Sequence, residues 1–149
     1  MEATRNGAPP AEGVITRDTP VGYELIGVKK KAAIQLMGSR VWGRFNPNHW
    51  DPVYAAETGL KAPIQTGEMS SAYLAEMCVN HFGAGFFTGA RMVCRYIASI
   101  SANEVIVTHG VVTEKTPKGD GHRFKVDIWV ENEAGEKKTV GWVEVDVEV

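Results

Sequence analysis

The sequence predicts a single α+β domain in which an antiparallel sheet wraps around one long helix. With 149 residues, the chain is long enough for one hydrophobic core of ordinary size. A long apolar helical pattern covers about residues 66–82, and the sequence after residue 90 has the texture of strands. A helix that is apolar over most of its circumference must be buried, and a following sheet buries it best by curling around it.

The first elements of the domain are expected to be short. Residues 1–20 are rich in Ala, Gly, Pro and Thr without periodicity, and we expect a flexible arm there, followed by one domain over residues 21–149. The apolar run Tyr23–Val28 is expected to form a first strand. A short helix should follow, because apolar residues recur at helical spacing at Ile34, Met37 and Val41. The lysine triplet at 29–31 is interpreted as a solvated face.

Two helices are predicted in the middle of the chain. Asp51 is a favoured N-cap and Pro52 suits a first helical position, so a short helix should run from Pro52 to about Thr58. The long helix should begin at Thr66 or Gly67 and end near Phe82. Its apolar stripe consists of Met69, Tyr73 and Met77 at intervals of four, widened by Leu74, Cys78, Val79 and Phe82.

Four strands are predicted after residue 90. They are rich in β-branched and aromatic residues and cover Met92–Ile97, Val105–Val112, Phe124–Val130 and Val140–Val149. Turn residues at 118–121 (K-G-D-G) and 132–135 (N-E-A-G) separate the later strands. In the last strand valines alternate with acidic residues, which is typical of a strand with one buried face. The sheet is therefore expected to be antiparallel.

Composition and charge narrow the classes of function. Hydrophobic residues make up 44% and charged residues 23%, as in soluble globular proteins, and no apolar run approaches the roughly 18–20 residues of a membrane helix. A net charge of −2 provides no basic surface for nucleic acid. Cys78 and Cys94 are interpreted as two buried thiols, and no ligand spacing indicates a metal. The first residues do not resemble a signal peptide, so we expect a cytoplasmic protein.

One segment carries a chemical signature. Residues 43–52 read G-R-F-N-P-N-H-W-D-P, followed by Y-A-A-E-T-G-L at 54–60. This resembles the signature of the MaoC-like (R)-specific hydratase/dehydratase family, G-D-x-N-P-x-H-x-D-P with a trailing Y-A-A-x-T-G-[FL]. The segment P-I-Q-T-G-E-M at 63–69 is similar to the family's I-A-H-G-M, and R-Y at 95–96 and S-A-N-E at 101–104 lie where the family has R-F and P-G-D. The resemblance covers about residues 23–149.

The resemblance implies a fold, a reaction and a set of roles. The fold would be the hot-dog fold, and the reaction the reversible addition of water across an enoyl thioester, carried by coenzyme A or a carrier protein. A homodimer is implied, and no cofactor. By resemblance His49 is the acid/base, and the Gly67 backbone N–H is the donor that polarises the thioester carbonyl. The substrate-binding positions would be Asn46, which would also orient the catalytic pair, together with Arg44 and Gln65.

The sequence departs from the family at the catalytic aspartate, where it has Arg44. A guanidinium stays protonated, so Arg44 cannot be a general base. Three explanations are open. Glu68, beside the presumed oxyanion glycine, could supply the missing carboxylate. The chemistry could have changed to isomerisation, thioester hydrolysis or another proton transfer that needs only His49. The chain could also be a noncatalytic subunit or a ligand-binding protein.

Each candidate residue also has a purely structural interpretation. Glu68 is an acidic residue in a helix's first turn, where such residues are favoured, and the cap position fully explains Asp51. His49 could be a packed histidine, and Gly67 could be required only for close helix packing. Arg44 could be an ordinary surface arginine or a cation that binds an anionic group of the substrate. The remaining histidines, His81, His109 and His122, match no motif position.

Overall fold

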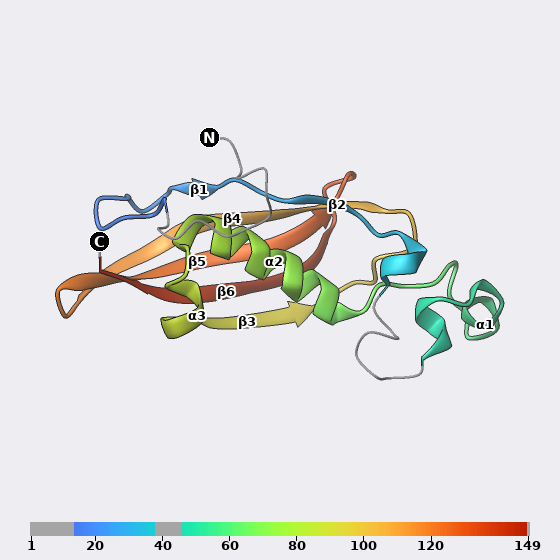
Figure 1. Cartoon of the computed structure of the whole chain (residues 1–149). Helices are drawn as coiled ribbons and strands as arrows, with labels where there is room; N and C mark the ends of the chain where they lie inside the picture. The colour runs from blue at the N-terminus through green and yellow to red at the C-terminus, as the bar shows by residue number, and fades with distance from the viewer. Residues whose placement is uncertain (1–13, 38–45, 149) are drawn as a thin grey trace.

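A computed structural model describes residues 14–37 and 46–148. The fold is a six-stranded antiparallel sheet with one long helix across one face, in the α+β arrangement predicted (Figure 1). The order along the sheet is β1-β4-β5-β6-β3, and β2 pairs with β4 beside β1. The strands are β1 (Glu24–Leu25), β2 (Lys29–Lys31), β3 (Arg91–Tyr96), β4 (Val105–Lys118), β5 (Gly121–Asn132) and β6 (Lys137–Val147).

The helices differ in their relation to the sheet. The long helix α2 (Gly67–Phe82) lies against the sheet, while α1 (Pro52–Glu57) lies beyond the end of the sheet at which α2 begins (Figure 1). The short α3 (Phe86–Gly89) follows α2, and the sequence did not predict it. Two short 3-10 turns complete the set, η1 (Ile34–Leu36) and η2 (Pro47–His49).

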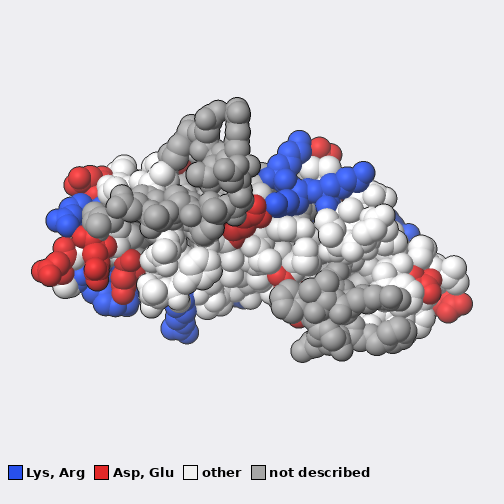
Figure 2. All heavy atoms as spheres, in the orientation of Figure 1, with Lys and Arg blue, Asp and Glu red and all other residues white. Residues whose placement is uncertain are grey.

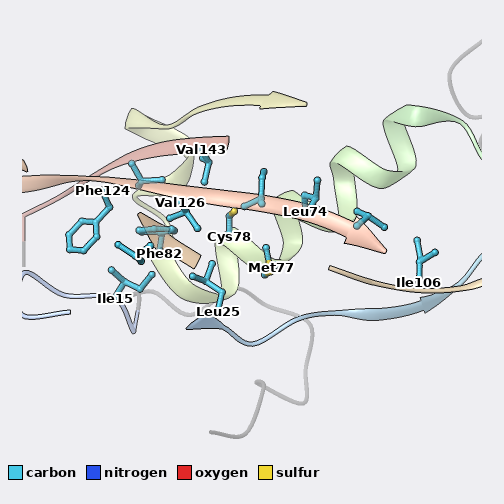
Figure 3. Close-up of a cluster of buried hydrophobic side chains, with 14 of the residues drawn as sticks. Ile15, Leu25, Leu74, Met77, Cys78, Phe82, Ile106, Phe124, Val126 and Val143 are labelled. Atoms are coloured by element: carbon cyan, nitrogen blue, oxygen red, sulfur yellow. The ribbon is translucent and has the colours of Figure 1, made fainter. Parts of the chain in front are cut away.

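The core lies between α2 and the inner face of the sheet. Leu74, Met77 and Cys78 are fully buried on α2, and Phe82 is 6% exposed. They meet the side chains that the strands alternately direct inward, among them Phe124, Val126 and Val143 (Figure 3). The predicted alternation in β6 is confirmed, because Val143, Val145 and Val147 are buried and the acidic residues between them are not. The burial of these apolar side chains is the interaction that holds α2 against the sheet.

The N-terminal segment departs from the prediction. The expected strand Tyr23–Val28 is only Glu24–Leu25, because the Ile26 N–H leaves the strand ladder and donates to the His81 ring at 3.0 Å. Hydrogen bonding to the sheet resumes at Val28, which accepts from the Thr108 N–H at 3.0 Å. The lysine triplet that follows forms the edge strand β2, with its side chains largely exposed. Ile15 is 1% exposed and its N–H donates to the His81 carbonyl, so the packed domain begins before the expected boundary at residue 21.

Other predictions need smaller corrections. The short helix expected from Ile34, Met37 and Val41 is a single 3-10 turn in its described part, with Met37 buried in the core; Val41 lies outside the described residues. The strands predicted after residue 90 are confirmed, and β4 extends six residues further than expected, to Lys118. Cys78 is buried, and burial raises the pKa of its thiol to about 12, whereas Cys94 is only half-buried.

The face of the molecule seen in Figure 2 has no dominant charge. On the face seen in Figure 2, acidic and basic side chains occur in small separate groups, and neither sign forms a continuous surface. None of the helices within the described residues combines the length and the hydropathy that a membrane crossing requires.

Candidate active site

His49 is presented by a short capped turn. The Asn46 side chain accepts a hydrogen bond from the Asn48 N–H at 3.1 Å, and Pro47 occupies the first position of η2, which ends at His49. Both features favour the start of a helical turn. Asn46 therefore positions the residue that carries the imidazole.

One backbone carbonyl fixes the orientation of the His49 ring. The Nδ1 atom lies 2.6 Å from the Ile64 carbonyl oxygen, and the Ile64 N–H donates to the Asn48 carbonyl at 3.0 Å. A carbonyl oxygen can only accept, so Nδ1 must carry the proton. In the neutral ring Nε2 is then an unprotonated acceptor, which is the state a general base requires.

The segment before α2 is held against the loop after β3. The Gln65 N–H donates to the Ile100 carbonyl at 2.8 Å, and the Ala102 N–H donates to the Pro63 carbonyl at 2.8 Å. Helix α2 then begins at Gly67, and the Met69 N–H donates to the carbonyl of the cap residue Thr66 at 3.2 Å. The cap residue Thr66 makes no side-chain cap bond. The amide end of a 16-residue helix is a favourable place for a polarised or anionic ligand group.

A cavity joins these two features. Its volume is about 350 Å³, and both His49 and Gly67 line it. The structure therefore brings together, from 18 residues apart in the sequence, an imidazole and the start of the buried helix. The remaining lining residues are Ile64, Gln65, Ser70, Tyr96, Ile97, Ala98, Ser99, Ile100 and Thr139.

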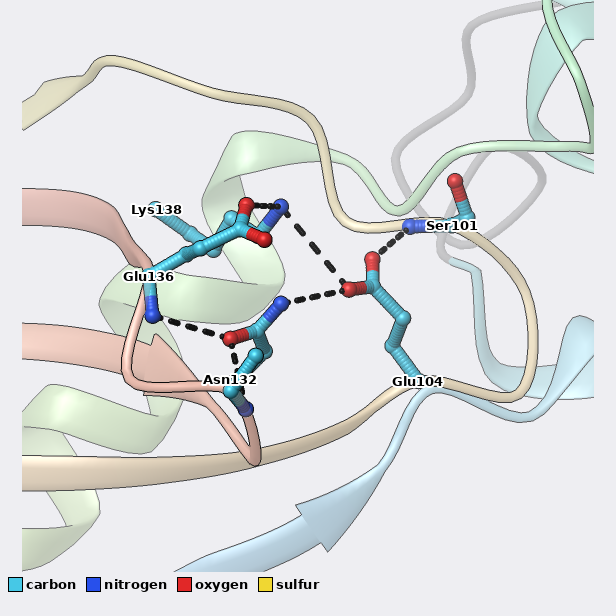
Figure 4. Close-up of polar contacts among 6 residues, drawn as sticks. Ser101, Glu104, Asn132, Glu136 and Lys138 are labelled. Carbon is cyan, nitrogen blue, oxygen red and sulfur yellow. Dashed lines mark hydrogen bonds and ion pairs between the residues drawn. The ribbon is translucent and has the colours of Figure 1, made fainter.

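A polar network holds the wall of the cavity at residues 97–101. The N–H groups of Ile97 and Ala98 donate to the Lys138 carbonyl at 2.9 and 3.1 Å. Glu104 accepts from the Ser101 N–H at 2.6 Å and from the Asn132 side chain at 3.0 Å (Figure 4). Burial raises the pKa of Glu104, but these hydrogen bonds and nearby Lys138 outweigh it and hold the pKa below its usual value. The ionised Glu104 carboxylate thus holds the segment at residues 97–101 in place through hydrogen bonds.

The remaining predicted site residues fall in different places. Gln65 lines the cavity and donates to the Ser70 hydroxyl at 3.0 Å. Glu68 is exposed and does not line the cavity, as its interpretation as a first-turn acid requires. Asp51 is confirmed as the cap of α1, because it accepts from the Val53 and Tyr54 N–H groups at 2.9 and 3.2 Å. Arg44 lies outside the described residues.

Tyr96 is a site residue that the sequence did not single out. It lies at the end of β3, lines the cavity, and its hydroxyl is 2.5 Å from Ser71 Oγ. The sequence offered only its position beside Arg95 in the family resemblance. Its proximity to Gly67 depends on how β3 and α2 meet, and 29 residues separate the two in the chain.

A second cavity lies on the outer face of the sheet and has a different character. Its volume is about 370 Å³, and its walls include Trp129 and Trp142 with Arg95, Lys137 and Asp127. The Lys137 Nζ atom lies 4.9 Å from the centroid of the Trp129 ring, and the His109 ring stacks on the same Trp129 ring. No helix start lines this cavity, so the His49 cavity is the better candidate. Among the described residues no three His, Cys, Asp or Glu side chains are grouped as metal ligands would be.

Comparison with known proteins identifies the family. No functionally curated sequence matches the chain. Among solved structures, the R-hydratase PhaJ1 from Pseudomonas aeruginosa superposes with a TM-score of 0.78 at 24% identity, covering 92% of this chain and 88% of that one. The (R)-hydratase from A. caviae involved in PHA biosynthesis superposes with a TM-score of 0.73 at 16% identity. The ChsH1-ChsH2 complex from Mycobacterium tuberculosis superposes with a TM-score of 0.73 at 17% identity. Each of these two alignments covers 87% of this chain and 98% of the other chain.

These structural similarities establish the hot-dog fold. The sequence model of the MaoC like domain matches residues 37–144, from the buried Met37 to a position near the end of β6. The match takes in the His49 turn, α2 and most of the sheet. Because it covers well over half of the sequence, the chain belongs to the MaoC-like domain family.

Proposed function

We propose that the protein is a hydratase/dehydratase for a β-hydroxyacyl or enoyl thioester, with His49 as the acid/base and the Gly67 N–H as the donor to the thioester carbonyl. The observation that carries the proposal is that both residues line one cavity while Nε2 is the unprotonated nitrogen of the neutral His49 ring. The membership of the MaoC-like family and the (R)-hydratase neighbours favour this reaction class.

One imidazole is sufficient for the proposed reaction. In dehydration, His49 Nε2 takes the proton from the carbon next to the carbonyl, and the electron pair moves onto the carbonyl oxygen. The enolate is stabilised by the Gly67 N–H and the positive end of the α2 dipole. When the carbonyl re-forms, the carbon–oxygen bond to the β-hydroxyl breaks, and the proton on His49 passes to the departing hydroxide to give water. This route needs neither the family's aspartate nor Glu68.

The cavity favours a small acyl group. Its volume of about 350 Å³ is at the lower end for ligand sites, and isoleucines at 64, 97 and 100 supply apolar lining. The carrier, coenzyme A or a carrier protein, would lie outside, in a cytoplasmic setting. We further propose a homodimer, because β3 is an edge strand of the sheet. An unpaired edge strand is a ready pairing site.

Turnover by a His49 variant tests the proposal. The purified chain is assayed with (R)-3-hydroxybutyryl and longer 3-hydroxyacyl thioesters of coenzyme A, following the enoyl product. We expect His49→Gln to lower kcat/KM by about 10²-fold or more, because it removes the only proposed acid/base. His109→Gln, on the outer face of the sheet, is the matched control and should retain the wild-type rate. Equal rates in wild type and His49→Gln would refute the role of His49.

A noncatalytic, ligand-binding subunit is the second candidate. The observation that favours it is that none of the described cavity residues is a carboxylate, while the family's aspartate position holds Arg44. The ChsH1-ChsH2 neighbour is a complex of two different proteins. Thioester binding by calorimetry, with no turnover by either wild type or His49→Gln, would favour this candidate over the enzyme.

A further inference from the structure

Tyr96 packs directly on the first residue of α2. A Cβ atom added to Gly67 would lie 2.8 Å from both Cε2 and Cζ of the Tyr96 ring, closer than atoms can approach. The ring edge that carries the hydroxyl therefore packs against the Gly67 position at the start of α2. The absence of a side chain at residue 67 is what admits the ring to this position.

The Tyr96 hydroxyl is also positioned by a second hydroxyl. Tyr96 Oη and Ser71 Oγ are 2.5 Å apart, and Ser71 is one helical turn beyond Gly67 on α2. When Ser71 donates to Tyr96, the phenol proton is free to point elsewhere. A hydroxyl that accepts one hydrogen bond becomes a better donor for the next. The pair can therefore act as a short donor chain that ends at the cavity.

From this arrangement we infer that the Tyr96 hydroxyl is a second hydrogen-bond donor to the substrate carbonyl, next to the Gly67 N–H. The inference rests on the proposed function. Tyr96 lines the cavity yet is 54% exposed, so it lies at the mouth. A thioester carbonyl must lie there, because it joins the acyl chain inside to the carrier outside. A phenol hydroxyl can donate a hydrogen bond to the carbonyl and, more strongly, to the enolate.

The vibration of the bound carbonyl tests the inference directly. Butyryl-coenzyme A lacks the β-hydroxyl and cannot be dehydrated, so it can be labelled at the carbonyl carbon and studied by infrared difference spectroscopy. Each hydrogen bond lowers the carbonyl stretching frequency. We expect a lowered frequency on binding to wild type and a smaller decrease with Tyr96→Phe, which keeps the ring over Gly67. Ser71→Ala should give an intermediate value.

Kinetics provide the second readout. Tyr96→Phe should lower kcat for (R)-3-hydroxybutyryl-coenzyme A by about 10²-fold with little change in KM, the effect of losing one oxyanion donor. Tyr73→Phe is the matched control, since that ring lies elsewhere on α2 beneath Lys30, and it should behave as wild type. Equal carbonyl frequencies in wild type and Tyr96→Phe would overturn the inference and leave the proposed function standing. A wild type without turnover that depends on His49 would overturn both.

Discussion

The two ends of helix α2 have opposite character. At the C-terminal end the side chains of Met77, Cys78 and Phe82 are 0–6% exposed and fill the space above the sheet. At the N-terminal end Glu68 is exposed, Gly67 has no side chain, and a cavity opens against the helix start. The same helix is thus closely packed against the sheet at its C-terminal end and borders a cavity at its N-terminal end.

The polar groups of the two ends differ in the same way. His81, 3% exposed near the C-terminus, has both ring nitrogens engaged: Nδ1 lies 2.8 Å from the Met77 carbonyl and Nε2 accepts from Ile26. Thr66, 8% exposed at the N-terminus, has a buried hydroxyl without a hydrogen-bond partner among the described residues. Stability is concentrated at one end of the helix, and unused donors, which a ligand can employ, at the other.

The largest expected effect is at the packed end. Phe82→Ala should lower the free energy of unfolding by about 3–5 kcal/mol, because it removes a buried ring that meets Phe124 edge to face at 6.5 Å. Urea denaturation measures it. Phe87→Ala is the control, since Phe87 on α3 is 70% exposed and its loss should change stability by no more than about 0.5 kcal/mol. Similar losses in the two variants would contradict the comparison.

An intermediate effect is expected at the end that borders the cavity, and on activity instead of stability. Gly67→Ala keeps the backbone N–H but displaces the Tyr96 ring, which its Cβ would meet at 2.8 Å. Misplacing a group that contacts the reacting atoms should lower kcat/KM by about 10²-fold. Stability should fall only slightly, because the Tyr96 ring that must move is 54% exposed. If Gly67→Ala lost much stability and kept its activity, the N-terminal end of α2 would serve stability and not the site, contrary to the comparison of the two ends.

The smallest expected effect is a pH dependence from His81. Burial lowers the pKa of His81 below 6.5 in the folded protein, and its bond to the Met77 carbonyl opposes this only in part. The unfolded state therefore binds the proton first. The stabilising contribution is complete above about pH 6.5 and is lost as the pH falls below it, by at most about 1.4 kcal/mol per pH unit.

Unfolding free energies of wild type and His81→Gln, measured from pH 7.5 down to 5, isolate this contribution. The other histidines are common to both proteins, so the difference between the two curves belongs to His81. We expect the wild-type curve to fall more steeply. Parallel curves would show that the packed end of α2 has no such titration.

Sequence patterns predicted the elements whose signal is local. The caps and periodicity gave α1 and α2 nearly residue by residue, since an N-cap and an apolar stripe act within a few residues of themselves. The motif at 43–52 predicted the family, which the match over residues 37–144 confirms, and it led to the proposal of His49 as the acid/base. The N-terminal strand was misjudged, because its end is decided by a hydrogen bond from Ile26 to His81, 55 residues away.

The sequence by itself determined the α+β class, the helix that needs burial and the imidazole that follows Asn46 and Pro47. Only the tertiary structure decided which groups share the cavity. It places the proton of the His49 ring on Nδ1, beside the Ile64 carbonyl, so that Nε2 is the unprotonated nitrogen. It also keeps Glu68 out of the cavity lining and packs the Tyr96 ring against Gly67. The physical reason is range: capping and periodicity are set by neighbours along the chain, whereas a site is set by contacts between segments that meet only when α2 is buried on the sheet.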